Sequence, residues 1–251
     1  MDEQRFFEAC RITEERARER SSIGTLGEKS LHAAIKRYFE PHEENHEVQV
    51  GDFVADIVGE DRVIEIQTRN FAAMRKKLAQ FLEIVPVTVV HPIIVDKTVI
   101  CIDEQTDSVT SKRKSTKHGT QYDIFNELWG IKPLLKEANL TLCLLMIDAT
   151  EYRFYGGERE KRARPQRSPK GYFASDRIPT KLRDEIYITC PYDYKRFLPP
   201  DLPECFTVRE LASLAGINEI IAGKMMPILT AAGVCEKVGQ RGKAYLYETV
   251  I

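Results

Sequence analysis

The sequence lacks the paired cysteines that build structural zinc sites. None of its six cysteines forms a C-x-x-C pair, so no cysteine framework for a structural metal is present. Four of them lie in or beside apolar runs that we interpret as strands: Cys101, Cys143, Cys190 and Cys235. We therefore expect buried free thiols rather than metal ligands.

Long apolar runs and a strong net charge are also missing. No apolar run approaches the roughly 18 residues that cross a bilayer, and residues 1–20 are charged without the apolar segment of a signal peptide. We expect a soluble, cytoplasmic protein with no membrane partner. The net charge is −1, so a surface for a polyanion must come from local clustering of basic residues.

Hydrophobic periodicity and turn signals predict an α/β chain of two domains. Hydrophobic residues make up 43% of the sequence, enough for a packed core. Prolines 199, 200 and 203 mark a linker, which places a larger domain at 1–198 and a smaller one at 204–251. The patterns predict helices at 2–20, 26–39, 71–82 and 122–135, strands at 47–58, 62–68, 87–95, 98–102, 140–149 and 185–190, and loops at 103–120 and 156–171.

The strands at 47–58 and 62–68 flank a glycine-containing turn and predict a β-hairpin. A two-residue loop and a four-residue loop give the same register. Asp56 then lies opposite Glu65, because side chains alternate between the two faces of a strand. The opposite face of the hairpin is apolar and is predicted to face the core.

Two carboxylates with Cβ atoms about 5 Å apart on a sheet repel each other, so something must offset that repulsion. A divalent cation would do so, and Mg²⁺ binds one or two carboxylates plus water and phosphate oxygens. Alternatively, one carboxylate is protonated or is paired with a nearby Arg or Lys, or the pair lies on an exposed polar face. Valines 54, 58 and 63 flank the pair and argue against full exposure.

The order of these residues resembles that of the PD-(D/E)xK nuclease superfamily. Its pattern places an acid on one strand and (D/E)-x-K on the next, as Asp56 and Glu65-Ile66-Gln67 do with Gln in place of Lys. Members often add a glutamate from a preceding helix, and Glu28 is placed to be that residue. The resemblance covers approximately residues 24–102. It implies a restriction-endonuclease-like mixed sheet flanked by helices.

The resemblance also implies phosphodiester hydrolysis that depends on Mg²⁺ or Mn²⁺. The groups that would hold the ion or act on water are Asp56, Glu65, the Ile66 carbonyl, Glu28 and Gln67. Gln67 would position the attacking water but carries no charge, and Arg69 or Lys29 is a candidate source of the missing charge. Alternatively, Glu28 completes a capping box that begins at Thr25 and only satisfies a backbone N–H.

Two basic segments stand out in a chain whose net charge is near zero. The first spans 112–119 and precedes a predicted helix, and the second spans 159–170. Lysine, arginine and the N–H groups of a helix start suit phosphate, whereas a solvated loop is the alternative for each segment. The candidate nucleic-acid contacts are Lys112, Arg113, Lys114, Lys117, Arg162, Arg164, Arg167 and Lys170.

Residues 206–250 resemble a small winged-helix (α+β) domain. The pattern predicts two helices, the second at 219–232, and then a hairpin at 235–249. The second helix of such a domain can enter the major groove of DNA, whereas protein–protein docking is the alternative. The candidate contacts to nucleic acid are Lys224 in the second helix and Arg241 and Lys243 at the hairpin turn.

The sequence therefore favours a metal-dependent endonuclease of the restriction or repair type that acts on DNA, with RNA as a further substrate class. Cleavage of both strands of a duplex would favour a homodimer. Two alternatives stay open. One is a non-catalytic DNA-binding protein with a degenerate nuclease fold, which Gln67 indicates. The other is a protein-interaction module.

Overall fold

The computed structural model describes residues 2–19, 29–103, 105–155 and 174–250. Contacts divide the chain into two compact units. The first unit comprises Met1–His46, Pro92–Thr120 and Leu145–Glu185, and the second comprises Glu47–His91, Gln121–Leu144 and Ile186–Ile251. The domain boundary expected near 199–203 stays a prediction. No helix in the described ranges is both long enough and apolar enough to cross a membrane.

The chain is α/β, and its large sheet is mixed. Its described strands are β1 (His46–Val50), β2 (Phe53–Val58), β3 (Val63–Ile66), β4 (Val87–Asp103), β5 (Ser108–Lys114), β6 (Leu140–Tyr155) and β7 (Ala174–Ile188). The strand order is β1-β2-β3-β4-β6-β7, and β5 pairs with β4. Strand β3 runs antiparallel to β2 and parallel to β4, whereas β5 runs antiparallel to β4.

In the second unit, the predicted hairpin and its register are confirmed. Ile57 pairs with Ile64, and the Gly59 N–H closes the turn by donating to the Arg62 carbonyl over 2.9 Å. Helix α3 (Phe71–Leu82) follows over the predicted residues. Its buried stripe packs into the core because apolar residues recur every three or four positions. The stripe consists of Phe71, Met74, Leu78, Phe81 and Leu82.

Two predictions about where one strand ends and the next begins were wrong. The stretch 47–58 is not one strand, because Gly51, with a φ of +57°, makes a turn between β1 and β2. Conversely, the predicted break at Asp96-Lys97 is absent, and β4 runs through it. Ion pairs from Asp96 to Arg183 and from Lys97 to Glu151 hold both residues in the extended strand.

The prediction of a loop over 103–120 was also wrong. Residues 108–114 form β5, and Val99 on β4 pairs with Arg113. Every residue of β5 is exposed. Edge strands commonly carry lysine and arginine. The basic composition of this segment was therefore compatible with a strand as well as with the predicted loop.

The helix predicted over 122–135 is replaced by two 3₁₀ helices, η3 (Gln121–Asn126) and η4 (Leu128–Leu134). Pro133 lies inside η4 and lacks the N–H that a regular helix would use. Gly130 permits close packing on α3, since a Cβ there would lie 2.2 Å from the Ala72 backbone nitrogen.

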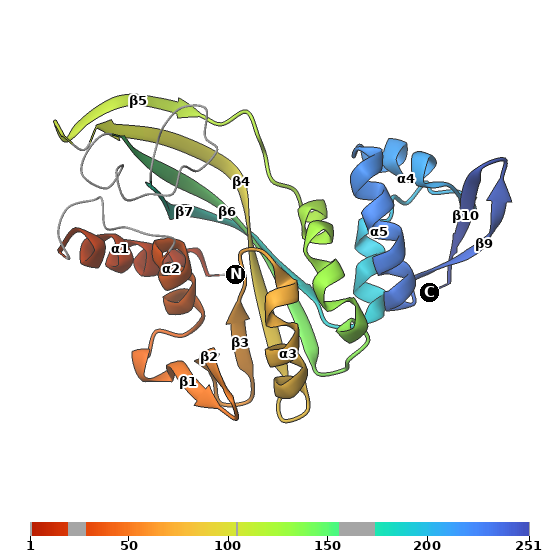
Figure 1. Cartoon of the computed structure of the whole chain (residues 1–251), viewed down its shortest axis with the longest axis horizontal. Coiled ribbons are helices and arrows are strands. Elements are labelled where there is room, and N and C mark those ends of the chain that lie inside the picture. The colour runs from red at the N-terminus through yellow and green to blue at the C-terminus, as the bar shows by residue number, and fades with distance from the viewer. Residues whose placement is uncertain (1, 20–28, 104, 156–173, 251) are drawn as a thin grey trace. The chain divides into compact units, whose positions relative to one another are not determined.

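In the first unit, α1 (Glu3–Glu19) and α2 (Lys29–Phe39) pack on each other, as Figure 1 shows. The apolar stripe of α2 is buried and consists of Leu31, Ala34, Ile35 and Tyr38. The Phe6 and Tyr38 rings meet edge to face, with centroids 5.2 Å apart. The short helix η2 (Glu43–Asn45) follows α2.

The C-terminal part of the second unit has two helices and a small sheet. After η5 (Pro191–Phe197), its elements are β8 (Cys205–Phe206), α4 (Val208–Ala215), α5 (Glu219–Ala232), β9 (Cys235–Arg241) and β10 (Ala244–Thr249). The sheet order is β8-β10-β9. Asn218 caps the N-terminus of α5, because its side chain accepts the Ile221 N–H over 2.8 Å. Helix α5 packs against η3 and η4 of the same unit.

Candidate functional site

Asp56 on β2 and Glu65 on β3 occupy facing positions, as the confirmed register requires. Each carboxylate accepts a backbone hydrogen bond from the opposite strand. The Ile66 N–H donates to Asp56 Oδ2 over 2.7 Å, and the Asp56 N–H donates to Glu65 Oε1 over 3.2 Å. Each of these two hydrogen bonds fixes the carboxylate of one strand against the backbone of the other strand.

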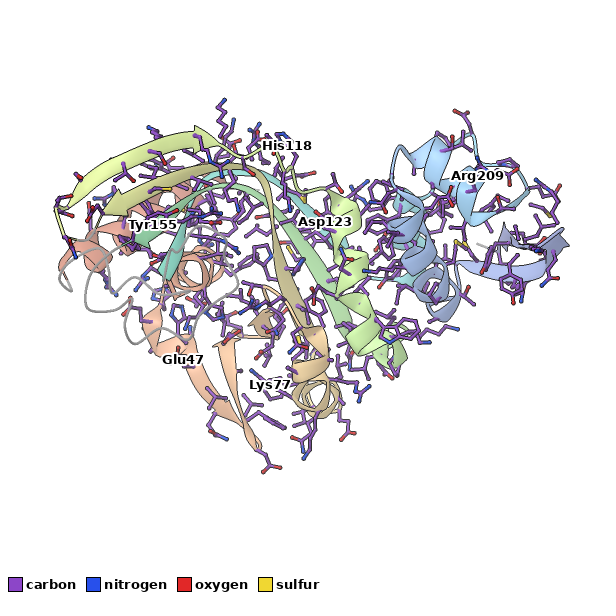
Figure 2. All side chains as sticks on the ribbon, turned by 45° about the horizontal axis from the view of Figure 1, so that its top comes forward. Glu47, Lys77, His118, Asp123, Tyr155 and Arg209 are labelled. Carbon is purple, nitrogen blue, oxygen red and sulfur yellow. The ribbon has the colours of Figure 1, made fainter. Side chains whose placement is uncertain are left out.

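Lys77 completes the group from α3, and Figure 2 labels it on that helix. Its Nζ lies 2.5 Å from Glu65 Oε2, and the two side chains are only 20% and 5% exposed. The sequence analysis missed this residue. A signal was available, because Lys77 lies three residues after Met74 and four before Phe81, on the buried stripe of the helix.

The electrostatics of Glu65 reflect its burial. Burial raises the pKa of Glu65, the negative charge of Asp56 raises it further, and the hydrogen bond from Lys77 lowers it, with the net result at about 7. Ionised and protonated Glu65 are therefore both populated near neutral pH. A divalent cation at this position would favour the ionised form.

The donor chemistry of Asp56 and Glu65 fits a hard divalent cation. In the part of the chain that the structure describes, no three His, Cys, Asp or Glu side chains are grouped to hold a metal ion. The pair therefore offers two carboxylates, a number that Mg²⁺ uses when water and phosphate oxygens complete its shell. Glu28, the predicted third carboxylate, lies outside the described residues.

Gln67 is engaged in local structure. Its side-chain nitrogen donates to the Arg69 carbonyl over 2.6 Å and to the Asn70 carbonyl over 3.3 Å, which holds the turn before α3. Its own carbonyl lies 2.7 Å from His91 Nδ1. Since a carbonyl only accepts, Nδ1 carries the hydrogen. Burial lowers the pKa of His91, so the ring is neutral at physiological pH.

The predicted nucleic-acid contacts fall into three groups. The first group consists of five exposed residues. Three of them lie on β5, Lys112, Arg113 and Lys114, and two lie outside it, Lys117 and Lys243. Two others already have partners within the chain: Lys224 donates to Asn126 over 2.7 Å, and Arg241 pairs with Glu210 at 2.7 Å. The remaining four lie outside the described residues: Arg162, Arg164, Arg167 and Lys170.

The model of one protein family, described as a domain of unknown function (DUF8091), matches residues 29–189. The chain belongs to the DUF8091 family. An uncharacterized protein of Treponema pallidum (strain Nichols) is 25% identical to this DUF8091 chain over 228 residues, which cover 90% of the chain and 87% of the relative. No solved structure matches. The family match includes Asp56, Glu65 and Lys77 but ends before α4 and α5.

Proposed function

We propose that this DUF8091 chain hydrolyses phosphodiester bonds of DNA in a reaction that depends on Mg²⁺ or Mn²⁺. One observation carries the proposal. Asp56 and Glu65 face each other on adjacent strands, and each is held by a backbone donor of the other strand. Two carboxylates on facing positions, with Glu65 buried and Asp56 part-buried, offer oxygen ligands of the kind that a hard cation binds.

The order of elements supports a restriction-endonuclease-like fold. Helix α2 precedes the strand with Asp56, the strand with Glu65 follows, and α3 and β4 come next. This is the order on which the resemblance to the PD-(D/E)xK superfamily rests. The parallel pairing of β3 with β4 accommodates α3 as the crossover between them.

The C-terminal elements support a winged-helix domain. Helices α4 and α5 are followed by the β9–β10 hairpin, and β8 completes the small sheet. Because α5 packs against η3 and η4, part of its surface is already covered. Exposed Lys243 in the turn of the hairpin is therefore a better candidate for a phosphate contact than Lys224 on α5.

Asp56 and Glu65 would hold the ion, and the Ile66 carbonyl and Glu28 are further candidate ligands. When bound, the ion supplies Lewis-acid polarisation of the phosphate and lowers the pKa of a coordinated water. Lys77 supplies the positive charge that Gln67 lacks. One ammonium hydrogen contacts Glu65, and the others can donate to a phosphate oxygen or to water.

The test is cleavage of supercoiled and single-stranded DNA by the full chain in Mg²⁺, Mn²⁺ or EDTA. Asp56→Asn and Glu65→Gln keep the side-chain volume, and each is expected to lower the rate at least about 100-fold. The matched control is Glu60→Gln, an exposed carboxylate in the same hairpin. Equal activity in wild type and both site variants would mean a contaminating nuclease and would sink the proposal.

Lys77 is tested separately by Lys77→Met, with Lys76→Met as the control on the exposed side of α3. We expect Lys77→Met to lose cleavage and Lys76→Met to keep it. Equal cleavage by the two variants would remove Lys77 from the proposed mechanism while leaving the carboxylates in it.

A second candidate is a DNA-binding protein without cleavage. Two observations favour it: the Gln67 amide is used in the turn before α3, and Lys77 already offsets the charge of Glu65. DNA binding without cleavage in any metal would support this candidate. No binding even at low salt would favour a protein-interaction module instead.

A further inference from the structure

A pocket opens in the second unit beside the start of β6, the end of β7 and η5. Its volume is about 210 Å³. Its walls are apolar and come from four side chains that are each at most 6% exposed: Leu135, Leu140, Leu142 and Ile188. A dry apolar cavity of about 150 Å³ holds a benzene molecule. The pocket therefore has room for one substituted ring.

Tyr194 on η5 also lines the pocket and carries a buried hydroxyl group. The side chain is 2% exposed, and its ring packs near Phe197, with centroids 6.3 Å apart. In the described part of the chain this hydroxyl makes no hydrogen bond. Burial raises the pKa of Tyr194, so the hydroxyl is neutral. A buried tyrosine hydroxyl usually has a partner, because an unpaired one costs free energy.

Tyr38 in the first unit shows the usual arrangement. Its side chain is also buried, at 5% exposed. Its hydroxyl donates to the Glu185 carboxylate and accepts the Asp2 N–H over 3.2 Å. Tyr38 is thus satisfied within the chain, whereas Tyr194 is not.

Asp193, the residue before Tyr194, is engaged elsewhere. Its Oδ2 accepts the Thr189 N–H over 2.7 Å, the Thr189 hydroxyl over 2.8 Å and the Cys190 N–H over 3.2 Å. These bonds fix the segment that lines one side of the pocket. Ligand sites are usually preformed in this way.

The charged side chains that line the pocket favour neither sign of ligand. They are Lys136 and Glu137, and both are exposed. Lys136 lies over the C-terminal end of α5, since its Nζ is 3.5 Å from the place that a Cβ on Gly233 would take. A cation is favourable at that end of a helix. Because a buried ion without a partner is costly, the pocket suits a neutral molecule.

We propose that this pocket binds a neutral molecule with one ring and one carbonyl group, of the class of aromatic ketones and aldehydes. The ring lies against the apolar walls, and the carbonyl oxygen accepts a hydrogen bond from Tyr194 Oη. A carbonyl fits because it only accepts, and the Tyr194 O–H is a donor. The proposal does not rest on hydrolysis at Asp56 and Glu65, because neither residue lines the pocket.

The test uses the full chain and two probes of nearly the same shape, acetophenone and ethylbenzene, of which only acetophenone has a carbonyl. Cys190 reports occupancy, because it is exposed and lines the pocket. Alkylation of Cys190 by iodoacetamide should slow as acetophenone fills the pocket. Cys205 does not line the pocket and is the internal reference. Mass spectrometry measures the two alkylation rates separately.

Tyr194→Phe removes the hydroxyl and keeps the ring. Acetophenone should then bind about 5-fold more weakly, which is the net effect of one hydrogen bond, and ethylbenzene should bind as before. The matched control is Tyr192→Phe, because Tyr192 also lies on η5 but is 63% exposed and does not line the pocket. This control should change the binding of neither probe.

Weaker protection of Cys190 by acetophenone alone in Tyr194→Phe supports the proposal. The proposal is overturned if neither probe slows alkylation of Cys190, or if Tyr194→Phe affects both probes equally. Thermal unfolding without a probe verifies the fold of each variant. Removal of an unpaired buried hydroxyl should leave the Tm unchanged or raise it. A lower Tm for Tyr194→Phe would mean that the hydroxyl already has a partner within the chain, which would also overturn the proposal.

Discussion

Replacement of Glu151 by glutamine should destabilise the chain strongly, although the two side chains have nearly the same volume. The substitution keeps the packing but removes the charge that Lys97, Arg153 and Arg177 share. Lys97, Arg153 and Arg177 then lose the anion that they share. Removing one partner of a buried ion pair is costly because it leaves charge uncompensated.

The magnitude follows from the lowered pKa of Glu151. A fall from 4.5 to about 2 corresponds to about 3 kcal/mol of stability, at about 1.4 kcal/mol for each pKa unit. Because the pKa is lower in the folded chain, this stabilisation is present above about pH 4.5 and is lost as the pH falls toward 2. The difference between Glu151→Gln and wild type should therefore be equal at pH 6 and pH 8.

Urea unfolding followed by circular dichroism measures this difference. A loss of about 3 kcal/mol lowers the midpoint by about 1 M urea if m is about 3 kcal/mol/M. Glu44→Gln is the control, because Glu44 is 76% exposed and should change stability by less than about 0.5 kcal/mol. A Glu151→Gln midpoint within the range of this control would refute the electrostatic reasoning.

Three further substitutions test the second unit by thermal unfolding. Glu65 has a folded pKa of about 7, above its ordinary 4.5, so wild type loses stability as the pH rises through this window. Glu65→Gln in EDTA at pH 8 should therefore be as stable as wild type or more stable, by up to about 3 kcal/mol. This change in stability is opposite in sign to that expected for Glu151→Gln. A lower Tm for Glu65→Gln than for wild type would contradict the raised pKa. Gly130→Ala should destabilise by about 1–3 kcal/mol, because the new methyl group would lie 2.2 Å from the Ala72 backbone. Gly223→Ala, in open space on α5, should instead stabilise the helix by up to about 1 kcal/mol; equal effects at the two glycines would show that α3 and η4 are not closely packed.

The parts that were predictable from sequence depend on local rules. The register of the β2–β3 hairpin follows from its turn, so Asp56 and Glu65 could be paired without a structure. The bounds of α3 follow from its helical periodicity. In both cases the residues that decide the structure lie within about a dozen positions of each other.

The remaining features depend on partners distant in sequence. Lys77 on α3 pairs with Glu65 on β3. Helical periodicity predicts that Lys77 lies on the buried face of α3, but it does not predict which residue it contacts. The Asp96-Lys97 pair has a turn-like composition, yet Arg183 and Glu151 hold it extended. Tertiary ion pairs override local preference at these positions, and sequence spacing does not reveal them.

The exposed strand β5 has a consequence for the behaviour of the protein in concentrated solution. It pairs with β4, and every one of its residues is exposed. An uncovered strand can recruit a strand from another molecule, and repulsion between lysines on the two edges prevents this. Lys112, Arg113 and Lys114 supply that repulsion. A polyanion that neutralises them would remove it, so light scattering should detect self-association at intermediate ratios of polyanion to protein and redispersal in high salt.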